Sequence, residues 1–235
     1  MKEKVVIYLI NSPLTKRDFS RFGIQNWINF GWKVRVFDIT KILYPNLLND
    51  LDERNEIKEF DGLTIFQKIN HLFFELNKLK NKLLFIDLLG ISIKENKIRK
   101  IAKTYGAIVE INLGSIPDPQ TSSIWEKIIL LKRPIIFFYA LQKFLRYNLE
   151  KILIKKNIPD YTVVSGTKSM AGIKDNETTI IKAHNFDYDF FLKEKNVKHK
   201  KNSNLLVFLD EYGPYHPDFV KFRTKPYVTK EKYYP

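Results

Sequence analysis

The sequence predicts an α/β fold built on a doubly wound, mostly parallel sheet. Three observations indicate this class: short apolar runs recur along the chain, helical patterns separate them, and turn residues stand at the junctions. The 235 residues are 44% hydrophobic, which is enough for a large core and excludes a disordered chain. The length suits one large domain, or one domain and part of another.

The chain opens as a strand–helix–strand unit. Residues 5–10 form a continuous apolar run, which is typical of a parallel strand buried on both faces. Either Ser12 or Thr15 caps the following helix, which is expected to continue unbroken to Gly31. Residues 34–39 form the second strand, because apolar side chains again predominate.

The α/β alternation continues beyond an irregular stretch at residues 41–60. Asp61 is expected to cap a helix that runs to Leu79 and places His71 on its polar, exposed side. A further helix covers residues 94–105 and ends at Gly106. The remaining predicted strands are residues 83–88, 107–113, 161–165, 178–183 and 205–210, and residues 121–157 are helical with a break at Pro134.

One boundary stands out near the end of the chain. A polar connection follows the strand at 178–183, and a new strand opens at Leu205. We therefore expect a domain at residues 1–203 and the start of an incomplete second domain at residues 204–235.

Charge and composition narrow the class of partner. The net charge is +14, yet 32 of the 40 basic residues are Lys and 8 are Arg. Because Arg reads bases and phosphates bidentately, its scarcity argues against a nucleic-acid-binding protein. The chain has no cysteine, which excludes disulfides and thiol nucleophiles and suits a reducing compartment. With no signal-peptide pattern and no long apolar run, a cytoplasmic protein is expected.

Candidate binding residues follow from a rule of doubly wound sheets, in which ligands bind at the carboxyl ends of the strands. The loop that opens at Ser165 offers hydroxyls, backbone N–H groups and a lysine, although an ordinary strand-to-helix turn is the competing interpretation. No dinucleotide-binding fingerprint follows the first strand, so a nicotinamide or flavin cofactor is not expected. The substrate-binding candidates at the strand ends are Ser12, Asn112, Gly114, Ser165, Gly166, Thr167, His184, Asn185 and Asp187.

A second polar cluster follows the predicted strand at 205–210. Glu211 and His216 are of the types that transfer protons, and Tyr215 can stack on a sugar or base. We therefore predict Glu211 and His216 as catalytic residues and Tyr215 as substrate-binding. The alternative is a proline-rigidified loop between domains. One histidine with scattered carboxylates does not make a metal site, so no metal is expected.

The segment 121–157 combines apolar runs with eight basic and two acidic residues. Such a helix suits an anionic membrane interface, with peripheral contact at the inner face. The competing interpretation is that its apolar residues face the sheet and its lysines face water. The membrane-contact candidates are Trp125, Lys132, Arg133, Phe137, Phe138, Lys143 and Arg146.

The order of these features resembles the GT-B glycosyltransferases. A strand, the run His184-Asn185-Phe186-Asp187-Tyr188-Asp189, a basic connector and the strand 205–209 are similar to the hinge between the two Rossmann-like domains of that family. The run from Phe208 to Phe219 resembles a bacterial group associated with surface polysaccharide or O-antigen assembly. The order of elements matches along most of the chain, whereas the specific residues cover about 40 positions.

The resemblance implies transfer of a sugar from a nucleotide-sugar donor to a glycan or lipid-linked acceptor, with no resident cofactor and a generally dispensable metal. The first domain would hold the acceptor, with Ser12 and the ends of the third to fifth strands lining it and Glu211 and His216 facing the cleft. The chain departs from the family because nearly all of the donor domain is missing. The alternative from another class is a non-catalytic Rossmann-like binding or scaffold protein whose basic helix docks on a membrane or an acidic partner.

Overall fold

We describe the protein from a computed structural model. The structure describes residues 3–45, 57, 59–79, 82–90, 92–113, 142, 145, 158–166, 168–170, 173, 177–195, 197 and 229–233. The predicted strand at 205–210 lies outside these residues, and of the predicted second domain at 204–235 only residues 229–233 are described. Nearly all of the segment 121–157 also lies outside them.

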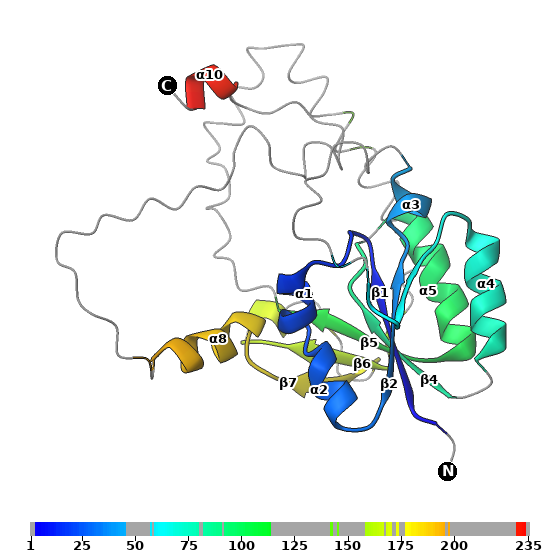
Figure 1. Ribbon diagram of the computed structural model, residues 1–235, viewed down its shortest axis with the longest axis horizontal. Coiled ribbons are helices and arrows are strands. Elements are labelled where there is room, and N and C mark those ends of the chain that lie inside the picture. The colour runs from blue at the N-terminus through cyan, green and yellow to red at the C-terminus, as the bar shows by residue number, and fades with distance from the viewer. Residues whose placement is uncertain are drawn as a thin grey trace. The chain divides into compact units, whose positions relative to one another are not determined.

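The described strands form one all-parallel sheet, which confirms the predicted fold class (Figure 1). Its order is β3-β2-β1-β4-β5-β6-β7. The strands are β1 (Val5–Ile10), β2 (Lys33–Asp38), β3 (Leu63–Ile65), β4 (Leu83–Asp87), β5 (Gly106–Asn112), β6 (Tyr161–Val164) and β7 (Thr179–Lys182). All six residues of β1 are buried, as its continuous apolar sequence predicts.

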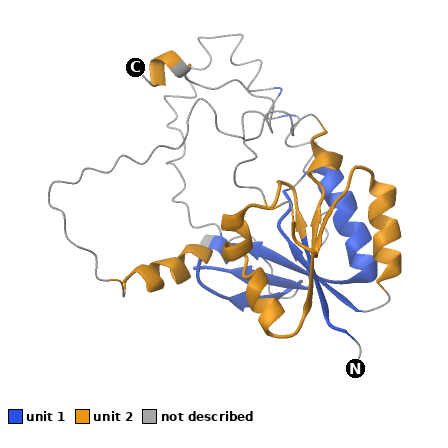
Figure 2. Ribbon diagram, in the orientation of Figure 1, with its two compact units in different colours: residues 1–8, 81–185 blue, residues 9–80, 186–235 orange. Residues whose placement is uncertain are grey.

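The chain divides into two compact units, which Figure 2 colours separately. Unit 1 comprises residues 1–8 and 81–185, and unit 2 comprises residues 9–80 and 186–235. Each is described by itself below.

In unit 1 the helix α5 (Ile93–Tyr105) leads into β5 without a loop. Gly106 is both the C-cap of α5 and the first residue of β5. A Cβ atom at this position would lie 2.0 Å from the carbonyl oxygen of Leu83 in the neighbouring strand. Glycine is therefore required here by the close approach of β4, and the predicted end of the helix is confirmed.

In unit 2 the first helical region is two helices, α1 (Lys16–Arg21) and α2 (Ile24–Asn29), so the prediction of one unbroken helix was wrong. Gly23 between them has a φ of 67°, in the left-handed region that favours glycine. Thr15 caps α1, since its side chain accepts a hydrogen bond from the Asp18 N–H at 3.1 Å. Of the two predicted capping residues, Thr15 is the one used.

A second correction concerns residues 61–79. Residues Leu63–Ile65 form β3, which pairs with β2, and the helix α4 begins only at Ile69 (Ile69–Lys78). Lys68 is the N-cap, not Asp61. His71 is exposed, as predicted. The short helix α3 (Thr40–Leu43) follows β2, in a stretch predicted to be irregular.

A third correction lies after β7, where the sequence predicts a polar connection. The structure places the ten-residue helix α8 (Phe186–Lys195) there. None of its ten residues is buried. The remaining described helices are the 3-10 turn η3 (Lys168–Met170) and the short α10 (Lys230–Tyr233).

Candidate functional site

The best-defined polar cluster of unit 1 lies at the carboxyl end of β4, where Asp87 and Arg99 form a buried ion pair. Arg99, from α5, donates to Asp87 through Nε and again through Nη2 at 3.3 Å. The same Nη2 donates to the carbonyl of Leu89 at 2.9 Å, and the Leu89 N–H donates to Asp87 at 2.9 Å. Both carboxylate oxygens of Asp87 therefore already accept hydrogen bonds from the protein.

A second buried carboxylate, Glu95, holds the next part of the same loop. It is 2% exposed and accepts hydrogen bonds from the N–H groups of Gly90 and Ser92, both at 2.9 Å. The Ser92 hydroxyl accepts from the Glu95 N–H at 3.3 Å, which completes a capping box at the start of α5. Gly90 fits because a Cβ atom there would come 3.0 Å from a Glu95 oxygen.

These contacts define what the β4–α5 loop can bind. A helix N-terminus usually offers free N–H groups to an anion, but here Glu95 occupies two of the loop's N–H groups. Glu95 and the Asp87–Arg99 pair therefore hold the loop in place, and the N–H groups of Gly90 and Ser92 are already used within the protein and not offered to an anion.

The candidates at the carboxyl ends of β5 and β6 come together in unit 1. Asn112 donates through Nδ2 to the carbonyl of Ser169 at 2.9 Å. The Ser169 hydroxyl in turn donates to the carbonyls of Ser165 and Gly166. Gly166 has a φ of 72°, so it supplies a left-handed turn. These bonds join β5 to the Ser165 loop.

The Ser165 hydroxyl can form a further hydrogen bond. Its hydroxyl oxygen is buried and has no hydrogen-bond partner among the residues that the structure describes. A buried hydroxyl without a partner is costly, so it points to a site where a further polar group is accepted. Within unit 1, this hydroxyl and the Asn112 amide are the candidates that can orient a sugar hydroxyl or a water.

His184 and Asn185 follow β7 in unit 1. His184 is exposed, and its Nδ1 lies 3.4 Å from the carbonyl oxygen of Asn185. An exposed imidazole is accessible to a substrate and is of a type that can transfer a proton.

In unit 2 Ser12 is exposed at the carboxyl end of β1, where it is open to solvent and to a ligand. Asp38 ends β2, is 3% exposed and accepts a 2.8 Å hydrogen bond from the Thr40 N–H. Burial raises the pKa of Asp38, and this effect exceeds the lowering by Thr40 and by the charge of Lys41.

Asp187 belongs to a contact between α1 and α8 within unit 2. Arg21 donates to its carboxylate at 3.1 Å, and the guanidinium carbon lies 5.6 Å from the centre of the Phe186 ring. The rings of Phe186 and Phe22 meet edge to face, with centroids 5.5 Å apart. The structure therefore gives Asp187 a role in joining two helices, while its predicted substrate contact stays a prediction.

Several predicted residues lie outside the described part of the chain. Among the substrate-binding and catalytic candidates these are Gly114, Thr167, Glu211, Tyr215 and His216. The membrane-contact candidates are also outside it: Trp125, Lys132, Arg133, Phe137, Phe138, Lys143 and Arg146. Their roles stay predictions.

Among the described residues, no group of three or more His, Asp or Glu side chains is arranged to hold a metal ion. None of the described helices is both long and apolar enough to cross a membrane.

Three buried or partly buried polar residues, Glu95, Arg99 and Asp38, were not predicted as part of any site. The spacing of Ser92 and Glu95 is a capping-box signal that could have located Glu95. Arg99 is twelve positions from Asp87, and nothing in the local sequence pattern links the two.

The comparisons with known proteins supply no further assignment, since no family model, curated protein or solved structure matches the chain.

Proposed function

We propose that the chain is the acceptor-side domain of a GT-B type glycosyltransferase. It would transfer a sugar from a nucleotide-sugar donor to a glycan or lipid-linked acceptor in surface polysaccharide assembly. The observation that supports this is the parallel sheet whose last described strand, β7, leads through His184 and Asn185 into α8. This is the position at which the sequence resembles the hinge of that family. Fold by itself does not define activity, so the proposal depends on the chemistry of the site.

In the proposed reaction an acceptor hydroxyl attacks the anomeric carbon of the donor. A bond forms between the acceptor oxygen and that carbon, the bond from the carbon to the diphosphate oxygen breaks, and the hydroxyl proton passes to a base. Glu211 or His216 is the proposed base. In unit 1, Ser165 and Asn112 would orient acceptor hydroxyls. The nucleoside diphosphate is the leaving group, and the donor-binding part of the site, which in this family is the second domain, would hold it until its release.

The β4–α5 loop is compatible with this assignment. Glu95 already uses two N–H groups of this loop, so the loop does not offer them to a phosphate, whereas the hydroxyls of an acceptor glycan need only hydrogen-bonding groups. An acceptor-side domain needs shape and hydrogen-bonding groups more than it needs an anion site.

The test is transfer of a labelled sugar from a panel of nucleotide sugars to lipid-linked glycan, using the chain alone and the chain supplied with a donor domain. We expect transfer with the supplied domain, and a loss of about 100-fold or more in Glu211→Gln or His216→Asn. Glu59→Gln, at an exposed acid, is the matched control and should keep full activity. Absence of nucleotide-sugar binding and of transfer in both formats would reject the proposal.

The second candidate is the non-catalytic scaffold. The observation that favours it is that the carboxylates of Asp87 and Glu95 already accept hydrogen bonds from the protein itself. These two carboxylates therefore serve to hold the loop and are poorly suited to act as catalytic groups. In this case the basic segment 121–157 would bind an anionic membrane or an acidic partner. Liposome flotation with and without anionic lipid tests the membrane form, and equal binding to both lipids would reject it.

A further inference from the structure

Glu110 is a charged residue within an otherwise apolar stretch of β5. It is the fifth residue of the strand, and only Asn112 at the end of the strand is also polar. A strand inside a parallel sheet is usually apolar along its length, because both of its faces are covered. Glu110 is half-buried in the structure, so its presence needs an explanation.

The Glu110 carboxylate forms no hydrogen bond or ion pair with the residues that the structure describes. The buried carboxylates in the same part of the chain are all bonded within the protein: Asp18, Asp38, Asp87 and Glu95. Removing a carboxylate from water costs free energy unless hydrogen bonds replace its hydration. A ligand that supplies hydrogen-bond donors would provide what Glu110 lacks.

The neighbours of Glu110 across the sheet do not account for it. The register places Asp87 of β4 on one side of Glu110 and Thr162 of β6 on the other. Asp87 is bonded to Arg99, and the Thr162 hydroxyl lies 3.0 Å from the Thr178 hydroxyl. Arg99 offsets the charge of Asp87, but like charges on neighbouring strands still destabilise a sheet. The stability of the sheet therefore does not explain Glu110.

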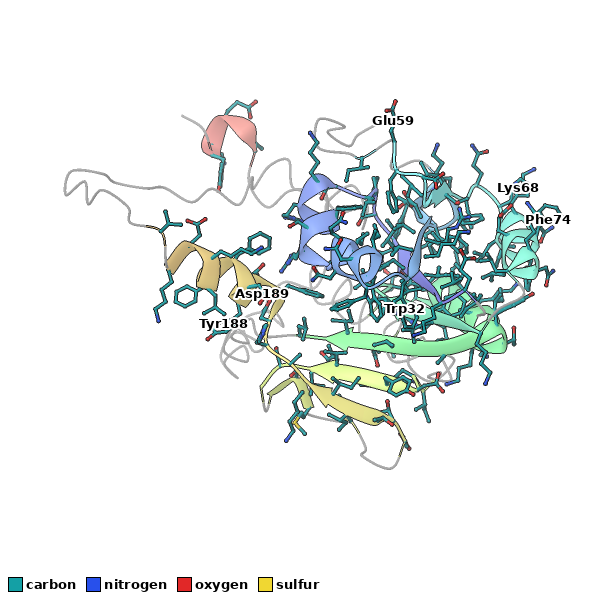
Figure 3. All side chains as sticks on the ribbon, turned by 60° about the horizontal axis from the view of Figure 1, so that its bottom comes forward. Trp32, Glu59, Lys68, Phe74, Tyr188 and Asp189 are labelled. Carbon is teal, nitrogen blue, oxygen red and sulfur yellow. The ribbon has the colours of Figure 1, made fainter. Side chains whose placement is uncertain are left out.

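Glu110 lies near the carboxyl end of β5, where ligands of doubly wound sheets bind. Asn112 lies on the same face, because side chains two positions apart in a strand point to the same side. The Asn112 amide donates to the carbonyl of Ser169, whereas its oxygen accepts no hydrogen bond from the described residues. Figure 3 draws β5 in pale green, with side chains on both of its faces. One face thus carries two groups that can accept hydrogen bonds.

The chemistry of these two groups indicates the class of ligand. A carboxylate and an amide oxygen only accept hydrogen bonds, so the ligand must donate them. Sugar hydroxyl and amino groups are such donors, and a bond from either to a carboxylate is charge-assisted and strong. We propose that Glu110 is a sugar-binding residue, whose carboxylate accepts hydrogen bonds from hydroxyl or amino groups of the acceptor sugar. The proposal rests on the proposed function only in naming this sugar as the acceptor.

The first test is sugar binding to the full chain, which needs no donor domain. The probes are methyl glycosides of glucose, galactose, mannose, glucosamine and glucuronic acid, measured by saturation-transfer NMR up to about 50 mM, because a few hydrogen bonds give millimolar affinity. We expect a neutral or amino glycoside to bind, and the glucuronide to bind more weakly because its charge repels Glu110. Tighter binding of the glucosamine probe would identify an amino donor, and equal binding of the neutral probes would identify hydroxyls.

Glu110→Gln keeps the shape of the side chain and removes its charge, so it should weaken sugar binding about tenfold or more. Because no hydrogen bond to the described residues is lost, its urea unfolding midpoint should equal or exceed that of the wild type. A structural role would instead lower the midpoint. Glu59→Gln makes the same change at an exposed carboxylate, labelled in Figure 3, and is the matched control that should leave both measurements unchanged.

The transfer assay separates this proposal from the proposed function. With a supplied donor domain, Glu110→Gln should raise the KM for the acceptor about tenfold and leave kcat and the KM for the donor nearly unchanged. Sugar binding that needs Glu110 without any transfer would reject the proposed function and leave the sugar site standing. The sugar site itself is overturned if the wild type binds none of the probes, if Glu110→Gln binds them equally well, or if its urea midpoint falls clearly below that of Glu59→Gln.

Discussion

Replacing Glu95 with glutamine tests whether one buried carboxylate holds the β4–α5 loop in place. The two oxygens of Glu95 accept 2.9 Å hydrogen bonds from the N–H groups of Gly90 and Ser92, and the residue is 2% exposed. Glutamine has almost the same shape but only one acceptor oxygen. Its amide nitrogen would therefore face a backbone N–H, and one of the two hydrogen bonds would be lost.

The expected cost follows from these contacts. A hydrogen bond to a charged group contributes about 1.5–3 kcal/mol, and a buried N–H without a partner costs about 1–3 kcal/mol on an overlapping scale. We expect the free energy of unfolding to fall by about 2–4 kcal/mol. With a urea m value of about 2 kcal/mol/M, the unfolding midpoint should fall by about 1–2 M.

Urea titration followed by circular dichroism measures the midpoint, and amide hydrogen exchange at Gly90 and Ser92 reports on the loop itself. Glu75→Gln is the matched control. Glu75 pairs with Lys78 at 2.6 Å, but both side chains are more than one third exposed, so its loss should cost less than about 0.5 kcal/mol. If Glu95→Gln lowers the midpoint no more than this control, the loop is not held by the carboxylate.

Four further predictions concern single residues. Lys103 and a backbone N–H lower the pKa of Asp160 against the opposing effect of burial. Asp160→Asn should therefore lower the free energy of unfolding at neutral pH, and the difference from wild type should vanish as the pH falls below about 3.8. Urea midpoints from pH 2 to 7 measure this difference. The pKa of Asp38 is raised, so the stability that this group contributes is lost as the pH rises through its pKa in the folded protein. Asp38→Asn should therefore leave the free energy of unfolding at pH 7 unchanged or increase it in the same titration. A clear destabilisation at pH 7 would contradict this expectation. Gly23→Ala and Thr15→Ala should each lower the free energy of unfolding by about 1 kcal/mol, the first through its left-handed φ and the second through the lost cap, and a thermal melt checks both.

The parts of the fold that could be predicted are those that an uninterrupted apolar run or a characteristic end residue marks in the sequence. The apolar run of β1 needs burial on both faces, and the end of α5 is marked by Gly106, so both follow from the sequence. The edge strand β3 was missed because three residues are too few to show a period of two. Its residues also continue the helical spacing of α4 by chance.

The helix α8 was missed for a different physical reason. Its apolar residues lie on two opposite sides, so no single amphipathic face appears in the sequence. The break between α1 and α2 was missed because a glycine within a helical pattern is compatible with either a continuous helix or a left-handed turn, and only the backbone conformation of Gly23 decides.

The candidate site was predicted in part. Asn112 and Ser165 lie at strand ends, where the topology rule places them, and a hydrogen-bond chain through Ser169 connects their loops. The ion pair between Asp87 and Arg99 could not be foreseen, because it depends on how α5 packs beside β4.

The junction at Gly106 has a consequence for protein engineering. Since no spacer separates α5 from β5, adding or removing one residue there would rotate the helix by about 100° or exchange the two faces of the strand. A linker, tag or circular-permutation point is therefore better placed at an exposed turn such as Asp61, and the α5–β5 connection should be kept intact in any redesigned version of this chain.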